Sequence, residues 1–315
     1  MRLGLFSDSL RHLDFEAMID WLAAEGLEAV EIGTGNFSAA PHCDLERLLA
    51  EPAAQGRFLD AIAGRGLALS ALNCSGNLLD PHPGRRERAQ RTLERTLQAA
   101  ELLGVATVVT MSGCPGDLAG GPYPNWVTCS WQAEYPELLE RQWQEAIIPF
   151  WQATGRAAAE RGRRIAIEMH PGQAVYNSRT LQRLRQAAGP AVGANLDPSH
   201  LFYQGMDPLV VVGHLGPDFI YHVHAKDTAF NPQEMALNGG LDARPMGRPG
   251  SRAWEYRTVG FGHDALWWRR FVSALRQVGY DGVLSIEHED ALMGAEEGIR
   301  KSVEFLGPIL LRTPA

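Results

Sequence analysis

The stretch IYHVHAKDT, residues 220–228, joins the pattern of a buried strand to two histidines, a lysine and an aspartate. Its β-branched and aromatic residues predict a short strand. Because side chains alternate between the two faces of a strand, His222 and His224 point to the same side. Two imidazoles on one buried face need polar partners, and we expect to find these partners on other strands.

Short apolar segments of the same kind recur along the chain and alternate with amphipathic helical segments. Seven further strands are predicted at 2–8, 29–35, 67–74, 105–113, 164–170, 192–198 and 282–289. Helices are predicted at 12–26, 45–66, 84–104, 135–162, 179–189, 206–216, 265–279 and 292–310. Eight such units predict an α/β chain that forms a single domain over 1–315, a (β/α)8 TIM barrel. The alternative is an open doubly wound sheet, but the first strand–helix turn lacks its glycine-rich phosphate loop.

Two long connections follow the fourth and seventh predicted strands, at 114–134 and 229–264. Both lie after strands, so in a barrel both belong to the face that carries the active site. Loops of this length are typically functional or disordered, and their aromatic content favours lids. Trp126, Trp131 and Trp254 lie on them, and each either stacks on a bound substrate or packs within the loop.

The composition excludes several partners. The net charge is −8 with no block of Lys or Arg, so we expect no nucleic-acid partner. No apolar run reaches the roughly 18–20 residues that a membrane helix needs, so we expect no membrane partner. The N-terminal stretch lacks the pattern of a secretory signal, and four cysteines are scattered without C-x-x-C pairs. We therefore expect a cytoplasmic protein with reduced thiols.

Carboxylates and imidazoles gather at the ends of the last four predicted strands. In a barrel these ends meet, and carboxylates crowded together take up protons unless a cation balances them. Oxygen ligands with one nitrogen suit Mn²⁺, with Mg²⁺, Co²⁺ or Fe²⁺ as alternatives. The pattern therefore predicts one divalent ion, and the proposed ligands are Glu168, Asp197, His224 and Glu287.

Residues next to the proposed ligands are expected to support the metal site without binding the ion. His222 lies one layer deeper than His224 and is expected in the core or behind the metal ligands. Choosing Glu287 over Glu289 as the ligand depends on the register of the last strand. Lys226 and Asp227 are predicted to form an ion pair behind the site.

These motifs together resemble the sugar phosphate isomerase/epimerase family of xylose isomerase-like TIM barrels. The resemblance extends over nearly the whole chain and rests on IEMH, DPSH, HAKD, RTVGFGHD and GYDGVLSIEHED. It implies that one divalent ion is held by the four ligands named above. It also implies that His200, the histidine of D-x-x-H, and Arg257, ahead of a Gly-x-Gly stretch, bind substrate. His170 departs from the epimerase pattern, and we expect it near the substrate.

The resemblance implies a metal-dependent sugar isomerase or epimerase, with a small sugar or keto-sugar as partner and a homo-oligomeric assembly. Glu168 and Glu287 are the candidate catalytic residues, which remove and return a proton next to a carbonyl through an enediolate. The alternative is a lyase that eliminates the aglycone from 3-keto-glycosides, with His170 as its acid or base. A related endonuclease for abasic sites needs additional histidines on earlier strands, and a non-enzymatic scaffold would not need the four ligands.

Overall fold

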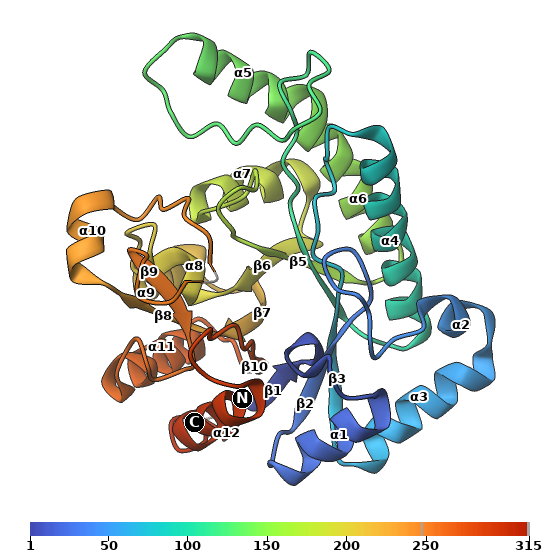
Figure 1. Cartoon of the computed structure of the whole chain (residues 1–315). Helices are drawn as coiled ribbons and strands as arrows, with labels where there is room; N and C mark the ends of the chain where they lie inside the picture. The colour runs from blue at the N-terminus through green and yellow to red at the C-terminus, as the bar shows by residue number, and fades with distance from the viewer. Residues whose placement is uncertain (247, 314–315) are drawn as a thin grey trace. The chain divides into compact units, whose positions relative to one another are not determined.

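The computed structural model describes residues 1–246 and 248–313. Eight parallel strands form a closed barrel in the order β1-β10-β7-β6-β5-β4-β3-β2, which confirms the predicted TIM barrel (Figure 1). The strands are β1 (Arg2–Phe6), β2 (Ala29–Gly33), β3 (Ala68–Asn73), β4 (Thr107–Met111), β5 (Arg164–Glu168), β6 (Val192–Leu196), β7 (Ile220–Ala225) and β10 (Val283–Ile286). Each strand lies within a predicted segment and ends one to three residues before the end of that segment, because the last residues of the segment belong to the following connection.

Helices follow the strands as the periodicity predicts. They are α1 (Phe15–Ala24), α2 (Leu45–Ala50), α3 (Pro52–Gly64), α4 (Pro83–Leu102), α5 (Glu134–Gln142), α6 (Ile148–Glu160), α7 (Ser178–Ala188), α8 (Pro198–Phe202), α9 (Pro208–Leu215), α10 (Pro232–Asn238), α11 (Ala265–Gln277) and α12 (Ala295–Leu306), with a 3-10 turn η1 at Ser7–Leu10. Aspartates cap several N-termini; Asp14 and Asp264 accept backbone N–H groups of the first turn. Within 1–246 and 248–313, no helix has the length and apolar character needed to cross a bilayer.

Two predicted helices are interrupted. Residues 45–66 form two helices because Pro52 cannot continue the first one. Residues 135–162 contain a π-helical turn, η2 (Trp143–Ile147), between α5 and α6. There the backbone N–H of Ile148 donates to the carbonyl of Trp143, and the next residue, Pro149, has no N–H to donate. The wide turn therefore sits where a proline breaks the regular ladder.

The chain divides into two compact units. Unit 1 comprises residues 1–32, 58–70 and 196–315, and unit 2 comprises residues 33–57 and 71–195. The single domain over 1–315 stays a prediction. In unit 1, β10 pairs with β1 and β7, and Ser285 lies in register with His224. This register brings polar side chains from several strands to one face of the unit.

The connection expected over 229–264 is largely ordered structure. Residues of β8 (Asp227–Phe230) pair antiparallel with β9 (Trp254–Arg257), and α10 lies between them in sequence. Helix α10 is orange in Figure 1. Its Met235 packs on a buried cluster that includes Tyr203 and Trp254, whose rings stack 3.6 Å apart. Trp254 therefore packs within this connection, which is a folded hairpin and helix with its own core.

Candidate metal centre

A buried carboxylate and two buried imidazoles meet in unit 1. Nε2 of His222 lies 2.7 Å from Oε2 of Glu31, and Nε2 of His224 lies 3.1 Å from the same oxygen. The hydroxyl of Ser285 also donates to that oxygen, at 2.8 Å. Burial by itself raises the pKa of Glu31, but the two facing imidazoles outweigh this effect and hold it well below its usual value. Glu31 is therefore a charged acceptor inside the unit.

The ring of His224 reaches two carboxylates at once. With Nε2 donating to Glu31, a neutral ring has its lone pair on Nδ1. This Nδ1 lies 3.2 Å from Oε2 of Glu287. A lone pair and a carboxylate oxygen at this distance repel each other unless a cation or an added proton balances them. The carboxylate behind Nε2 also orients the ring, as carboxylates commonly do for metal-bound histidines.

Asp197 joins the same group from the start of α8. It caps that helix, and its Oδ1 accepts the backbone N–H of Ser199 at 2.8 Å. One ligand atom each from Asp197, His224 and Glu287 lie within 4.8 Å of one another. Two carboxylates and one imidazole are donors that suit a divalent cation of the manganese or zinc type. The residues present therefore fit a metal ion.

Two overlapping groups could hold an ion in unit 1. Glu31, His222 and His224 form one of them, and their ligand atoms also lie within 4.8 Å of one another. The other contains Asp197, His224 and Glu287, so that His224 belongs to both. Glu168, the fourth predicted ligand, is the last residue of β5 in unit 2 and is buried. Glu31 was not among the predicted ligands. Its local signal is a single carboxylate inside the buried apolar strand AVEIG, but its partners are about 190 residues away and could not be identified from the sequence.

Lys226 lies among the carboxylates of this group. Its ammonium is 2.6 Å from Glu287, 2.9 Å from Glu289 and 3.2 Å from Oδ2 of Asp197. Burial lowers the pKa of Lys226, but the facing carboxylates more than compensate, so the pKa is well above its usual value. The expected ion pair of Lys226 with Asp227 is replaced by these three contacts. The alternation of the strand explains the difference, because residues 226 and 227 point to opposite sides.

Asp227 instead holds the following loop together. Its carboxylate accepts the backbone N–H groups of Gly260, Gly262 and His263 at 2.9–3.1 Å. Its other oxygen lies 2.7 Å from Nδ1 of His263. Such a cluster of donors fixes the backbone of the RTVGFGHD motif. The role of Asp227 in unit 1 is structural.

The three predicted substrate-binding residues have different surroundings. His200 is buried in α8, with Nδ1 2.9 Å from the hydroxyl of Tyr256 and Nε2 3.2 Å from Oδ2 of Asp197. Arg257 ends β9, and its Nε donates to Asp290 at 2.9 Å. His170, two residues beyond β5 in unit 2, has Nδ1 2.6 Å from the carbonyl oxygen of Pro171. Their contacts with substrate stay a prediction.

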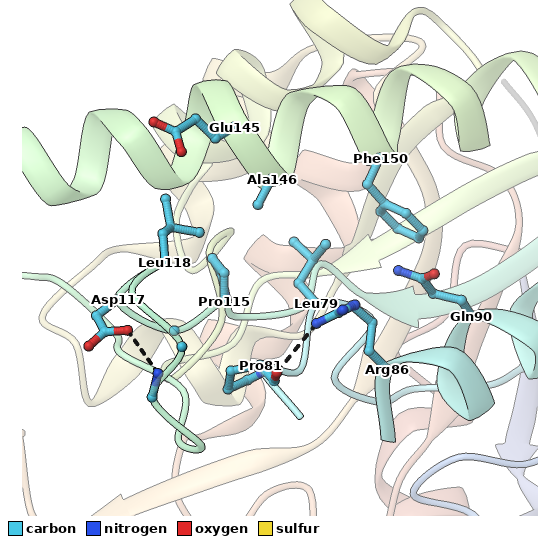
Figure 2. A pocket seen from close by; sticks show the side chains of 13 residues that line it. Leu79, Pro81, Arg86, Gln90, Pro115, Asp117, Leu118, Glu145, Ala146 and Phe150 are labelled. Atoms are coloured by element: carbon cyan, nitrogen blue, oxygen red, sulfur yellow. Dashed lines mark hydrogen bonds between the residues drawn. The ribbon is translucent and has the colours of Figure 1, made fainter. Parts of the chain in front are cut away.

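Unit 2 contains a cavity of about 410 Å³ (Figure 2). Its walls come from the residues after β3 and β4, from α4, and from the π-helical turn and α6. Two of the polar groups drawn in Figure 2 bond to other lining residues: Arg86 donates to the carbonyl of Pro81, and Asp117 accepts the N–H of Gly121. Since none of the predicted site residues lines it, no chemistry is assigned to this cavity.

Fold and motifs define the class of this protein. The sequence pattern of the Xylose isomerase-like TIM barrel family matches residues 19–309, and the chain belongs to that family. The resemblance inferred from the strand-end motifs is thereby confirmed. The chain is 43% identical to the uncharacterized protein YfiH of Bacillus subtilis (strain 168), over 97% of this chain and 98% of that protein.

More distant relatives carry names that describe reactions. The chain is 25% identical to inosose dehydratase of Geobacillus thermodenitrificans (strain NG80-2), over 54% of this chain and 56% of that enzyme. Among solved structures, IOLI protein with a bound zinc atom has a TM-score of 0.67 at 17% identity, covering 98% of both chains. D-psicose 3-epimerase in the presence of D-fructose has a TM-score of 0.59 at 15% identity, covering 98% of this chain and 99% of that one. The two structures show that the fold is shared.

Proposed function

We propose that this protein is a divalent-metal-dependent sugar isomerase or epimerase that moves a proton next to a carbonyl. The observation that carries the proposal is the group formed by the buried Asp197 and His224 and the partly buried Glu287, whose ligand atoms lie within 4.8 Å of one another. Family membership and the epimerase fold support the choice of reaction. The partner in this reaction is a small sugar or keto-sugar.

We assign the ion to the group with the two carboxylates. Asp197, His224 and Glu287 would hold it, and Glu168 is proposed as the fourth ligand because the family resemblance implies it. Mn²⁺ is the preferred ion, with Mg²⁺, Co²⁺ and Fe²⁺ as alternatives, because the donors are mostly oxygen. Glu31 then acts behind the ligands: it accepts the Nε2 proton of His224 and so keeps Nδ1 available as a donor.

The bound ion supplies Lewis acidity, which acidifies the C–H beside a carbonyl and stabilises the oxyanion that forms. Glu168 or Glu287 removes that proton, and the other carboxylate returns it. Lys226, 2.6 Å from Glu287, makes a charged hydrogen bond that orients this carboxylate. His200 and Arg257 are proposed to position the substrate hydroxyls.

A second candidate function is elimination, and the match to inosose dehydratase favours it. Elimination and epimerisation begin with the same proton removal and differ in the second step. In the lyase, a leaving group departs from the β-carbon of a keto-sugar or keto-glycoside, and an acid protonates it. His170 is the candidate for this acid.

The test combines metal analysis with isotope exchange. The purified protein is expected to hold one divalent ion per chain, and Glu287→Gln is expected to abolish stoichiometric binding. Glu31→Gln is expected to weaken it by about 10- to 100-fold, the usual effect of removing a group behind a ligand. Glu289→Gln is the matched control, since it removes the same charge from a residue outside the ligand group. If Glu31→Gln abolishes binding and Glu287→Gln does not, the ion belongs with Glu31 and His222.

The reaction is then assayed with Mn²⁺ and a panel of ketoses and keto-glycosides in D₂O. Solvent deuterium at a carbon next to the carbonyl of a recovered epimer or isomer supports the leading proposal. An unsaturated product with a released leaving group assigns the elimination instead. Stoichiometric metal without exchange or elimination on any keto-sugar contradicts both reactions.

A further inference from the structure

The folded hairpin after β7 places a tyrosine against the candidate metal centre. Tyr256 lies on β9, where it is in register with Thr228 of β8, and it is buried. Its hydroxyl is 2.9 Å from Nδ1 of His200. The ammonium of Lys226 lies 4.7 Å from the centroid of its ring, within the range of a cation–π contact. One side chain of the hairpin thus touches two residues that contact Asp197.

The surroundings of His200 select one of its two neutral tautomers. Nε2 faces Oδ2 of Asp197 at 3.2 Å, so a lone pair on Nε2 would point at a carboxylate charge. The proton is therefore more favourable on Nε2, and Nδ1 becomes the acceptor. Two tyrosine hydroxyls face Nδ1, and that of Tyr256 is the nearer, at 2.9 Å against 3.5 Å for Tyr203.

A second tyrosine extends this hydrogen-bond network and fixes the direction in which its members donate. The hydroxyl of Tyr203 lies 3.4 Å from that of Tyr256, so Tyr203 can donate to the oxygen whose proton Tyr256 gives to His200. The donors then point from Tyr203 through Tyr256 and His200 toward Asp197. Tyr203 also stacks on Trp254 of β9, which fixes its ring. Charge-directed networks of this kind hold each member in one orientation.

We infer that Tyr256 is a positioning residue of this site: it locks His200 as the Nε2–H tautomer, with that N–H directed at the metal-ligand carboxylate. The inference deepens the proposed function, because it makes the hairpin a working part of the centre. In this arrangement both ring nitrogens of His200 bond within the protein, so His200 orients Asp197, and this role replaces the substrate contact proposed for it above. The test of the tautomer needs neither a substrate nor a bound ion.

The test is ¹⁵N NMR of the full chain labelled at its histidines. The ring resonances of His200 are assigned as the pair that disappears in His200→Gln. In the wild type we expect a protonated Nε2 and an unprotonated, hydrogen-bonded Nδ1. In Tyr256→Phe we expect the ratio of the Nε2–H tautomer to the Nδ1–H tautomer to fall roughly fivefold, the factor that corresponds to one ordinary hydrogen bond.

Tyr280→Phe is the matched control. Tyr280 has the same 8% exposure as Tyr256, and its hydroxyl also makes a buried hydrogen bond, to the carbonyl of Val283 at 2.7 Å. This variant loses a comparable hydrogen bond, so it should lower the melting temperature like Tyr256→Phe without moving the resonances of His200. A wild-type ring protonated on Nδ1, or resonances that are the same in Tyr256→Phe, would overturn the inference.

Binding of Mn²⁺ to the wild type and to Tyr256→Phe separates this inference from the proposed function. If the wild type binds no ion while the tautomer responds to Tyr256→Phe, the proposed function fails and the role of Tyr256 stands. If the wild type binds one ion while the tautomer is unaffected by the substitution, the role of Tyr256 fails and the metal centre stands.

Discussion

Replacement of Lys226 by methionine should destabilise the metal-free protein strongly. The ammonium lies 2.6, 2.9 and 3.2 Å from three carboxylates, and the side chain is buried. At an effective dielectric constant of about 20, the pairs with Glu287 and Asp197 each contribute an attraction of about 5 to 6 kcal/mol, which the cost of burying the ions largely offsets. The pair with Glu289 contributes less, because that side chain is 48% exposed and water screens its charge. Methionine has a side-chain volume similar to that of lysine but no charge, so the three carboxylates repel one another. Breaking a buried pair in this way typically costs about 3 to 5 kcal/mol.

The free energy of unfolding is measured by urea titration in the presence of a chelator, for the wild type and for Lys226→Met. Lys301, the second of the chain's two lysines, is the matched control. It pairs with Glu297 at 2.8 Å on an exposed helix face, so Lys301→Met should cost about 1 kcal/mol or less.

Added Mn²⁺ is expected to restore much of the lost stability of Lys226→Met, because the ion replaces the missing positive charge. The reasoning is refuted if Lys226→Met and Lys301→Met unfold with the same free energy. It is also refuted if Lys226→Met binds Mn²⁺ but gains no more unfolding free energy from the ion than the wild type does.

Three further predictions concern the same unit and the thiols. Gly262→Ala would place a Cβ against the carbonyl of Thr228 and disturb the N–H donated to Asp227, so urea denaturation should show a loss of about 2 to 4 kcal/mol. The pKa of Glu31 lies below its ordinary value of 4.5, so its charge stabilises the fold above that pH, and this stabilisation is lost as the pH falls through the folded pKa. The difference in unfolding free energy between the wild type and Glu31→Gln should therefore shrink on acidification below about pH 4.5. A difference that stays constant with pH would contradict this assignment. Burial raises the pKa of Cys43, Cys74 and Cys114 to about 12, whereas Cys129 is exposed, so a thiol reagent at pH 8 should modify one cysteine rapidly and three slowly.

The sequence alone determined the barrel and much of the candidate ligand set. Strand and helix periods are local properties, and eight apolar segments separated by amphipathic helices leave few arrangements that bury both faces of every strand. The ends of those strands could likewise be read locally, which singled out Asp197, His224 and Glu287. The helix periodicity did not predict the breaks within 45–66 and 135–162. They lie at Pro52 and before Pro149, and their form, a new helix or a π-helical turn, depends on the neighbouring hydrogen bonds.

Only the tertiary structure decided which side chains share charge and protons. Glu31 meets His222 and His224 across about 190 residues, and Lys226 contacts Glu287 and Glu289 instead of its neighbour in sequence. Such pairings depend on strand register and on the alternation of faces, because a shift by one residue reverses every side chain. The connection after β7 likewise reads as a loop until it folds back on itself, and then it delivers Tyr256 to His200. Polar partners in a buried site are selected by three-dimensional distance, which a linear pattern does not specify.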